Sequence, residues 1–246
     1  MGQLEGKAAI ITGGGSGIGK AIALAFAREG CGLTIAGRNV TRLEAAANEM
    51  RALGAEVLAV PTDVTIEAEV IALFEKAMAR FGRLDILVNS SGAFDGGPLE
   101  SLSLEAWNNV IGANLTGPFL CIREAFKIMK PAGGGRIINI GSISAQRTRE
   151  NMAPYTASKF GIWGLTQAAA LEGRDYGIAV SCLHPGNTLV ERRIAGQARG
   201  RPEDAEPMFE PEVIARCALL MATLPPEANM LEAIVLPLQQ KYLGRG

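Results

Sequence analysis

The chain has 246 residues, of which 48% are hydrophobic, and its formal net charge is −1. A chain of this length can bury the core of one α/β domain, and its balanced charge provides no basic surface for binding nucleic acid. Its four cysteines and single histidine lack metal-binding spacing and fit free thiols in a reducing compartment, so we expect a cytoplasmic protein with no bound metal.

Short apolar segments rich in Val, Ile and Leu alternate with longer segments of helical period along the chain. This alternation predicts a single α/β domain over residues 1–246, with a doubly wound sheet of about seven parallel strands and helices on both faces. The expected strands are Ala8–Thr12, Leu33–Ala36, Glu56–Val60, Leu84–Asn89, Arg136–Ile140, Ile178–Leu183 and Ala233–Leu236. The expected helices are Gly17–Glu29, Arg42–Leu53, Ile66–Phe81, Leu104–Met129, Tyr155–Tyr176 and Pro211–Thr223.

The first strand runs into a glycine-rich segment, and a helix follows. Glycines allow a tight turn and a close approach to a pyrophosphate, while the free N–H groups at the helix start attract negative charge. The spacing Gly-x3-Gly-x-Gly differs from the general fingerprint Gly-x-Gly-x2-Gly, and glycines also serve as plain turns. The position after the first strand favours a Rossmann-type dinucleotide site with contacts from Gly13, Gly15, Ser16, Gly17, Ile18 and Gly19.

The same glycines and Lys20 interrupt the apolar stretch Ala8 to Ala27, so we expect no membrane segment there. The segment Leu33 to Leu43, which follows next, has no carboxylate of the kind that NAD-binding proteins usually offer to the ribose. It presents Arg38 instead, whose guanidinium suits a 2′-phosphate. The sequence therefore favours NADP(H) over NAD(H). The alternative is that Arg38 is a solvated residue at a helix start, because Ser16 adds no second positive charge.

The ends of the third and fourth strands predict further cofactor contacts. Asp63 could accept a hydrogen bond from adenine, with Val64 beside it, or could equally be the N-cap of the next helix. The segment Asn89-Ser90-Ser91-Gly92 closes the fourth strand at the carboxyl edge of the sheet, where ligands of open α/β folds bind. We expect Asn89 and Gly92 to form part of the cofactor wall there.

Three side chains in the second half of the chain suggest acid–base chemistry. Tyr155 and Lys159 lie four residues apart on one face of a predicted helix. Free tyrosine has a pKa of about 10, and an adjacent positive charge favours the phenolate, which would make Tyr155 a better general acid or base. Ser142 follows the fifth strand, where its hydroxyl could hold a substrate oxygen. A Tyr-x3-Lys pair alone is common on ordinary helices.

With these three residues, the chain resembles the short-chain dehydrogenase/reductase family over essentially its whole length. The other segments that carry the resemblance are, in order, Thr12 to Gly19, Asp63, Asn89 to Gly92, Asn114 and Pro185-Gly186. The resemblance implies hydride transfer between a nicotinamide and an alcohol or carbonyl carbon. It also implies a catalytic tetrad, in which Asn114 holds a water that relays protons toward Lys159. The tetrad is Asn114, Ser142, Tyr155 and Lys159.

The resemblance further implies that Tyr155, Lys159, Pro185 and Gly186 contact the cofactor, with Lys159 bonded to the nicotinamide ribose. Two departures from the family pattern stand out. Ser90 and Ser91 replace the usual Asn and Ala, and Val190 replaces a threonine that touches the nicotinamide carboxamide, a role we assign to Thr188. Homodimers or homotetramers are the assemblies that the family implies.

The substrate is expected to be a small alcohol, ketone or hydroxy acid. The ending after Leu224-Pro225-Pro226 weakly resembles 3-hydroxy acid and serine dehydrogenases. Arg192 and Arg193 lie in a polar excursion, about 186–210, that we expect to cover the substrate, and they could bind a carboxylate or be solvated. The alternative function is a catalytically silent dinucleotide-binding sensor or scaffold, against which the complete tetrad argues.

Overall fold

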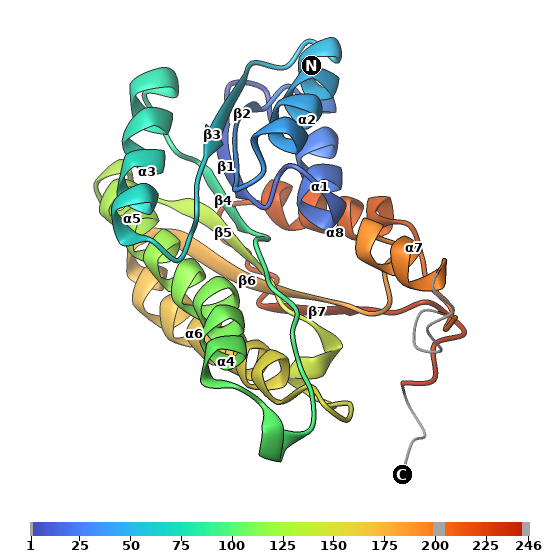
Figure 1. Ribbon diagram of the computed structural model, residues 1–246. Coiled ribbons are helices and arrows are strands. Elements are labelled where there is room, and N and C mark those ends of the chain that lie inside the picture. Colours follow the sequence, from blue (N-terminus) through green and yellow to red (C-terminus); the bar gives the residue numbers. More distant parts are fainter. Residues whose placement is uncertain (1, 199–204, 243–246) are drawn as a thin grey trace.

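Seven parallel strands form one sheet in the order β3-β2-β1-β4-β5-β6-β7. The computed structural model describes residues 2–198 and 205–242. Helices cover both faces of the sheet, which confirms the predicted Rossmann-type α/β fold (Figure 1). The strands are β1 (Ala8–Thr12), β2 (Gly32–Gly37), β3 (Val57–Pro61), β4 (Ile86–Asn89), β5 (Gly135–Ile140), β6 (Ile178–Pro185) and β7 (Glu232–Val235).

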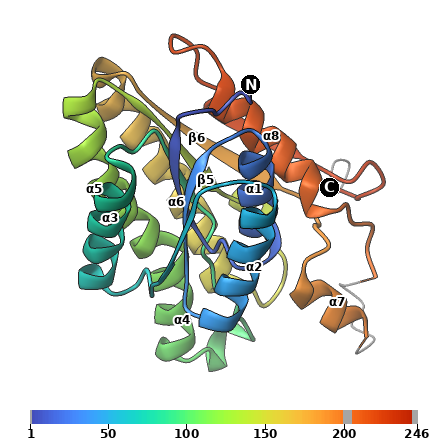
Figure 2. The same ribbon diagram turned by 90° about the horizontal axis from the view of Figure 1, so that it is seen from above.

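The helices form two layers, as Figure 2 shows from above. One layer consists of α1 (Gly17–Arg28), α2 (Val40–Ala52) and α8 (Pro211–Thr223), and the other of α3 (Glu67–Phe81), α4 (Leu104–Ile111), α5 (Gly117–Ala132) and α6 (Ala153–Gly173). The short helix α7 (Glu191–Gln197) projects beyond the sheet. It lies in the predicted excursion, of which residues 199–204 are outside the described residues.

Each helical layer encloses its own hydrophobic cluster against the sheet. Successive residues of a strand point to opposite faces, so Ile10 and Ile11 of β1 contribute to different clusters and are each at most 1% exposed. Burial on both faces explains why the strands read as continuous apolar runs instead of alternating ones. In the described part of the chain, no helix is long and apolar enough to cross a bilayer, and no cluster of side chains could hold a metal ion.

The predicted helix Leu104–Met129 is interrupted in the structure. A π turn over Gly112–Thr116 separates α4 from α5, closed by the bond from the amide of Gly117 to the carbonyl of Gly112. Pro118 has no N–H to donate to the carbonyl four residues earlier, so a regular α-helix cannot continue through this point. The interruption falls on Asn114, which the sequence analysis selected for its chemistry.

The strand order places the site. The chain crosses from β3 at one edge to β4 beside β1, and ligands of open α/β sheets bind where the order reverses in this way. The carboxyl ends of β1, β4, β5 and β6 therefore face one region. The β5–β6 register, which pairs Ile140 with Leu183, brings the segment after each strand alongside the other.

Asp85, just before β4, joins its own segment to the start of β1. Its carboxylate accepts hydrogen bonds from the Ala8 amide at 2.9 Å, from Arg83 Nε at 2.7 Å and from Lys7 Nζ at 3.3 Å. Burial by itself raises the pKa of Asp85, but the bonds from Arg83 and Ala8 and the two cationic charges outweigh it, so the pKa lies below its usual value. Asp85 consequently stabilises the fold in its ionised form.

We predict that Asp85→Asn lowers the melting temperature by a few degrees at pH 7 and that the deficit shrinks on acidification. A depressed folded pKa contributes stability above the unfolded pKa of about 3.9, and that contribution is lost as the pH falls through the folded pKa. Thermal unfolding between pH 7 and pH 3 measures both effects. Asp175→Asn, at a side chain 84% exposed, is the control and should change little. A deficit for Asp85→Asn that is the same at every pH would contradict the prediction.

Candidate active site

A cleft of about 1290 Å³ opens at the carboxyl edge of the sheet. Segments from the end of β1 to the end of β6 line it, so residues far apart in the sequence meet there. The predicted site residues that line it are Gly13, Gly15, Ser16, Gly17, Ile18, Gly19, Arg38, Asp63, Val64, Gly92, Asn114, Ser142, Tyr155, Lys159, Pro185, Gly186 and Thr188.

Asn89 is the predicted site residue placed elsewhere. Its side chain is 3% exposed and donates to Asn139 Oδ1 at 2.8 Å, across the register that pairs β4 with β5. Asn139 in turn donates to Thr166 of α6 at 2.9 Å. The side chain of Asn89 therefore joins two strands inside the protein, and its placement does not support the predicted cofactor contact.

The glycine turn after β1 packs closely against the segment that follows β4. Gly13 has φ +69°, and a Cβ there would lie 2.7 Å from the carbonyl oxygen of Ser90. A Cβ on Gly19 would lie 2.4 Å from the carbonyl oxygen of Gly13. Thr12 Oγ1 accepts hydrogen bonds from the amides of Ser90 and Ser91, both at 3.1 Å. The glycines are therefore required for the turn itself, and Thr12 fixes it to the neighbouring loop, a role that the sequence analysis missed.

The start of α1 holds a carboxylate in this structure. The amide of Gly17 donates to Glu191 Oε1 of α7 at 3.2 Å, and the first turn of α1 has no acidic residue of its own. Amides at a helix start attract negative charge because they lack partners within the helix. The position predicted for a pyrophosphate therefore has the chemistry to hold an anion. Glu191 is 174 residues away in the sequence, so no local signal points to it.

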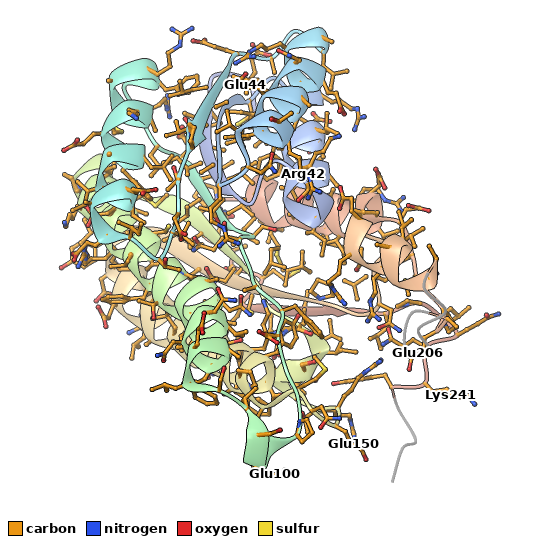
Figure 3. The ribbon with its side chains drawn as sticks, viewed as in Figure 1. Arg42, Glu44, Glu100, Glu150, Glu206 and Lys241 are labelled. Carbon is orange, nitrogen blue, oxygen red and sulfur yellow. The ribbon has the colours of Figure 1, made fainter. Side chains whose placement is uncertain are left out.

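Two arginines stand beside the ends of β2 and β3. Arg38 Nη1 lies 3.9 Å from Asp63 Oδ2, with the arginine side chain 65% exposed. Arg42, on the first turn of α2, also lines the cleft and adds the second positive charge that the sequence analysis did not find (Figure 3). The side chain of Asn39 caps α2 by accepting from the Arg42 amide at 2.9 Å, which fixes the first turn of α2 directly after Arg38.

Asp63 does not cap α3, which begins at Glu67 after Ile66. Its Oδ1 accepts instead from the amide of Thr65 at 2.9 Å and from the hydroxyl of Thr65 at 2.8 Å. Burial raises the pKa of Asp63, but the bonds from Thr65 and the charge of Arg38 outweigh it and leave the pKa below its usual value. Asp63 therefore presents a carboxylate to the cleft.

Tyr155 and Lys159 lie on the first turns of α6, as the four-residue spacing predicts. Lys159 is 7% exposed, and its Nζ donates to the carbonyl of Ile140 at 2.8 Å and lies 5.5 Å from the centre of the Tyr155 ring. On another side, the Phe94 ring centre lies 5.1 Å from that of Tyr155. The phenol is therefore placed between an aromatic wall and a buried cation, and its hydroxyl makes no hydrogen bond to any described residue.

Ser142 follows β5 directly and is 8% exposed. Its Oγ accepts from the amide of Ser144 at 3.1 Å, across the 3-10 turn Ile143–Ala145. The hydroxyl hydrogen is donated to no described residue. Ser142 thus has a fixed oxygen and a donor available to a molecule in the cleft.

Asn114 occupies the π turn and is 2% exposed. Its Oδ1 accepts from the Ala93 amide at 2.7 Å, and its Nδ2 donates to the Ala93 carbonyl at 3.0 Å and to Ser158 Oγ at 3.1 Å. Ser158 Oγ in turn donates to the carbonyl of Tyr155 at 2.7 Å. Both amide hydrogens of Asn114 are used, so its side chain ties the loop after β4 to the turn that carries Tyr155.

The outer end of the cleft is bordered by charged side chains. Glu206 accepts from Arg149 at 2.5 Å and from Asn187 at 2.7 Å, which joins the loop before α6 to the loop after β6. Arg193 Nη2 donates to Asn187 Oδ1 at 3.3 Å, and the Arg192 guanidinium carbon lies 4.2 Å from the centre of the Phe94 ring. Arg192 and Arg193 therefore both line this end of the cleft.

Comparison with known proteins gives consistent matches over this fold and site. The family model described as short chain dehydrogenase matches residues 7–198. A short chain dehydrogenase/reductase of Aspergillus oryzae is 38% identical over 233 residues, which cover 90% of this chain and 89% of the relative. An uncharacterized oxidoreductase of Staphylococcus aureus strain MRSA252 is 34% identical over 237 residues, or 96% of this chain and 100% of the relative.

Solved structures agree. A metagenomic short-chain oxidoreductase in complex with NADP superposes with a TM-score of 0.84 at 32% identity, covering 97% of this chain and 100% of that one. A putative gluconate dehydrogenase from Agrobacterium tumefaciens has a TM-score of 0.87 at 34% identity, covering 94% of this chain and 95% of that one. The likeness therefore extends over the sheet and the cleft together.

Proposed function

The chain belongs to the short-chain dehydrogenase family and is an NAD(P)-dependent oxidoreductase; we propose that it prefers NADP(H) and uses Tyr155 as its general acid or base. The proposed substrate is a small alcohol, ketone or hydroxy acid. The observation that carries the proposal is that Tyr155, Lys159 and Ser142 line one cleft with an anion-holding glycine turn.

The residues of this chain divide the work between binding and proton transfer. A bound nicotinamide supplies or accepts the hydride. Ser142 donates its hydroxyl hydrogen to the substrate oxygen and holds that oxygen beside Tyr155. Tyr155 gives its proton to the oxygen during reduction and takes it back during oxidation. The ammonium of Lys159, fixed by the Ile140 carbonyl, stabilises the negative charge that the phenol oxygen then carries.

The cleft suits a dinucleotide along its whole length. Its volume of about 1290 Å³ exceeds the roughly 300–1,000 Å³ of sites for drug-sized ligands. The start of α1 would take the pyrophosphate, Asp63 and Val64 the adenine, and Thr188 the carboxamide. Both amide hydrogens of Asn114 are donated to Ala93 and Ser158, so Asn114 can only accept from a water, and we assign its proposed relay toward Lys159 to the backbone carbonyl.

Arg38 and Arg42 support the preference for NADP(H). A guanidinium binds phosphate through parallel N–H bonds, and two of them line the cleft near the ends of β2 and β3. The metagenomic relative crystallised with NADP is consistent with this preference. Near the other end of the cleft, Arg192 stacks on Phe94 next to Tyr155, where it could bind the carboxylate of a hydroxy acid.

The remaining proposals concern organisation. We propose one catalytic domain over residues 1–246, assembled as a homodimer or homotetramer and located in the cytoplasm. Three of its cysteines, Cys31, Cys121 and Cys182, are buried thiols whose pKa burial raises to about 12, which fits a protein that keeps free thiols unreactive.

Tyr155→Phe should lower turnover at least about tenfold, because it removes the proposed proton donor and little else. Oxidation of NADPH with a panel of ketones, aldehydes and keto acids measures turnover, and NADPH fluorescence measures binding, which should change less than turnover. Tyr176→Phe, at an exposed tyrosine, is the matched control. A smaller loss would contradict the proposed role, and wild-type protein that binds NADPH tightly but reduces nothing would favour the silent sensor.

Arg38→Gln should raise the Kd for NADPH about tenfold or more and leave the Kd for NADH within about twofold, because only NADPH carries the 2′-phosphate. Arg42→Gln should act in the same direction. Arg28→Gln removes the same charge from the far end of α1 and should leave both values unchanged. Equal weakening of NADPH and NADH by Arg38→Gln would overturn the assignment.

Glu191→Gln should lower the Kd for NADPH about two- to fivefold. The carboxylate of Glu191 occupies the Gly17 amide that the pyrophosphate needs, and a charge at a helix start is worth about 0.3–1 kcal/mol. Glu210→Gln, an exposed position just before α8, makes the same change in net charge and should have no effect. Weaker NADPH binding by Glu191→Gln would show that this carboxylate assists the cofactor instead of competing with it.

A further inference from the structure

His184 is the only histidine of the chain and is completely buried, at the end of β6. Its ring atom Nδ1 lies 2.9 Å from the carbonyl oxygen of Ser142 and 3.2 Å from the amide nitrogen of the same residue. One ring nitrogen thus meets both polar backbone groups of Ser142. No step of the proposed mechanism uses this imidazole.

Gly141, directly before Ser142, leaves room for the contact between His184 and Ser142 because it has no side chain. The β5–β6 register ends with Ile140 opposite Leu183, and the amide of Gly141 donates to the carbonyl of Leu183 at 2.8 Å. A Cβ on Gly141 would lie 2.5 Å from His184 Nδ1 and 2.8 Å from Cys182 Sγ. Any other residue at position 141 would therefore push the imidazole away from Ser142.

The opposite side of the ring faces a carboxylate. His184 Nε2 lies 3.4 Å from Glu232 Oε1 of β7 and has no hydrogen-bond partner, while the Trp163 ring packs edge-on at 5.8 Å. Glu232 Oε1 accepts from Gln146 Nε2 at 2.9 Å, and Gln146 Oε1 accepts from the hydroxyl of Tyr242. The imidazole is therefore backed by a chain of polar groups that leads to the protein surface.

This network reaches both ends of the short turn that carries Ser142. His184 meets the backbone of residue 142, and Glu232 holds the side chain of Gln146, four residues later. Between them runs the 3-10 turn Ile143–Ala145, which also supplies the Ser144 amide to Ser142 Oγ. Two contacts to one short turn restrict where the serine oxygen can lie.

We propose that His184 is a positioning residue for Ser142: its Nδ1 fixes the serine backbone, and Glu232 orients the ring through Nε2. The inference rests on the proposed function only for the catalytic importance of Ser142. When Nδ1 carries the hydrogen, it donates to the Ser142 carbonyl, and when Nε2 carries it, Nδ1 accepts from the Ser142 amide, so either tautomer holds the serine. Glu232 orients the ring in the second tautomer, because a carboxylate can only accept from an N–H at Nε2.

The charges around the ring agree with this role. Burial lowers the pKa of His184, the contact with Ser142 and the charge of Glu232 raise it, and the charge of Lys159 lowers it further, with a net lowering. Among the described residues these are the titratable groups that act on the imidazole. The ring is therefore neutral near pH 7, so the contact needs no ion pair.

A pair of amide substitutions tests the positioning role by kinetics. Asparagine places its amide near the position of Nδ1, whereas glutamine reaches only toward Nε2. His184→Asn should keep kcat within about threefold, and His184→Gln should lower it about tenfold or more, since small misplacements of a catalytic group carry such costs. The Kd for NADPH should be unchanged in both. Equal losses in the two variants, or none in either, would overturn the proposal.

Nuclear magnetic resonance tests the contact without any turnover, which separates this inference from the proposed function. In untagged, ¹⁵N-labelled protein, the single imidazole gives one pair of ring nitrogen signals. We expect these signals to remain those of a neutral ring as the pH falls through 6.5, the ordinary pKa of histidine, with a slowly exchanging N–H. A ring that titrates with an ordinary midpoint and exchanges rapidly would refute the contact, even if the His184 variants do not fold.

Glu232→Gln removes the charge that raises the pKa of His184, and Glu232 is 31% exposed, so the change should be tolerated. The titration midpoint of the ring should therefore be lower in Glu232→Gln than in the wild-type protein. Glu227→Gln, at an exposed position in the loop before β7, is the control and should leave the midpoint unchanged. An unchanged midpoint in Glu232→Gln would remove Glu232 from the network.

Discussion

The parallel pairing of β1, β4, β5 and β6 is the constraint on which the site depends. Parallel strands end at the same edge, so the segments that follow them meet regardless of their separation in the sequence. The amide of Gly17 thereby meets a carboxylate 174 residues away, and Ser142 meets an imidazole 42 residues away. The two hydrophobic clusters cover the two faces of the sheet. Polar groups of the sheet can therefore gather only at the ends of the strands.

At that edge, buried polar side chains bond mainly to backbone. The amide of Asn114 is bonded to Ala93, the ammonium of Lys159 to the Ile140 carbonyl and the imidazole of His184 to Ser142. Each bond replaces hydration that the side chain lost on burial, and each fixes the course of a loop. The hydroxyls of Tyr155 and Ser142 keep their hydrogens for a molecule in the cleft. The site is thus held by bonds to backbone groups, while the two hydroxyls proposed to meet the substrate oxygen stay available.

Features encoded by neighbouring residues were predictable from the sequence. The apolar runs gave the strands, and the glycine turn, Ser142 and the Tyr155–Lys159 pair are local patterns that fall on the predicted elements. Arg42 was missed although it lies four residues beyond Arg38, because the second positive charge was sought at Ser16 in the glycine turn and not on the following helix. The direction of the Asn89 side chain was not predictable for a different reason: a strand end has an inner and an outer face, and the sheet register places this side chain against Asn139.

Contacts between distant segments left no local pattern to read. Glu191 is one charged residue in a polar stretch, and its position over α1 follows only from the path of the chain after β6. His184 looks like an ordinary residue of an apolar strand until the register places Gly141 beside it. Of these two residues, Gly141 is the one whose type is constrained, because a side chain at position 141 would collide with the imidazole. A glycine directly after a buried strand can therefore indicate a side chain packed against it from the neighbouring strand.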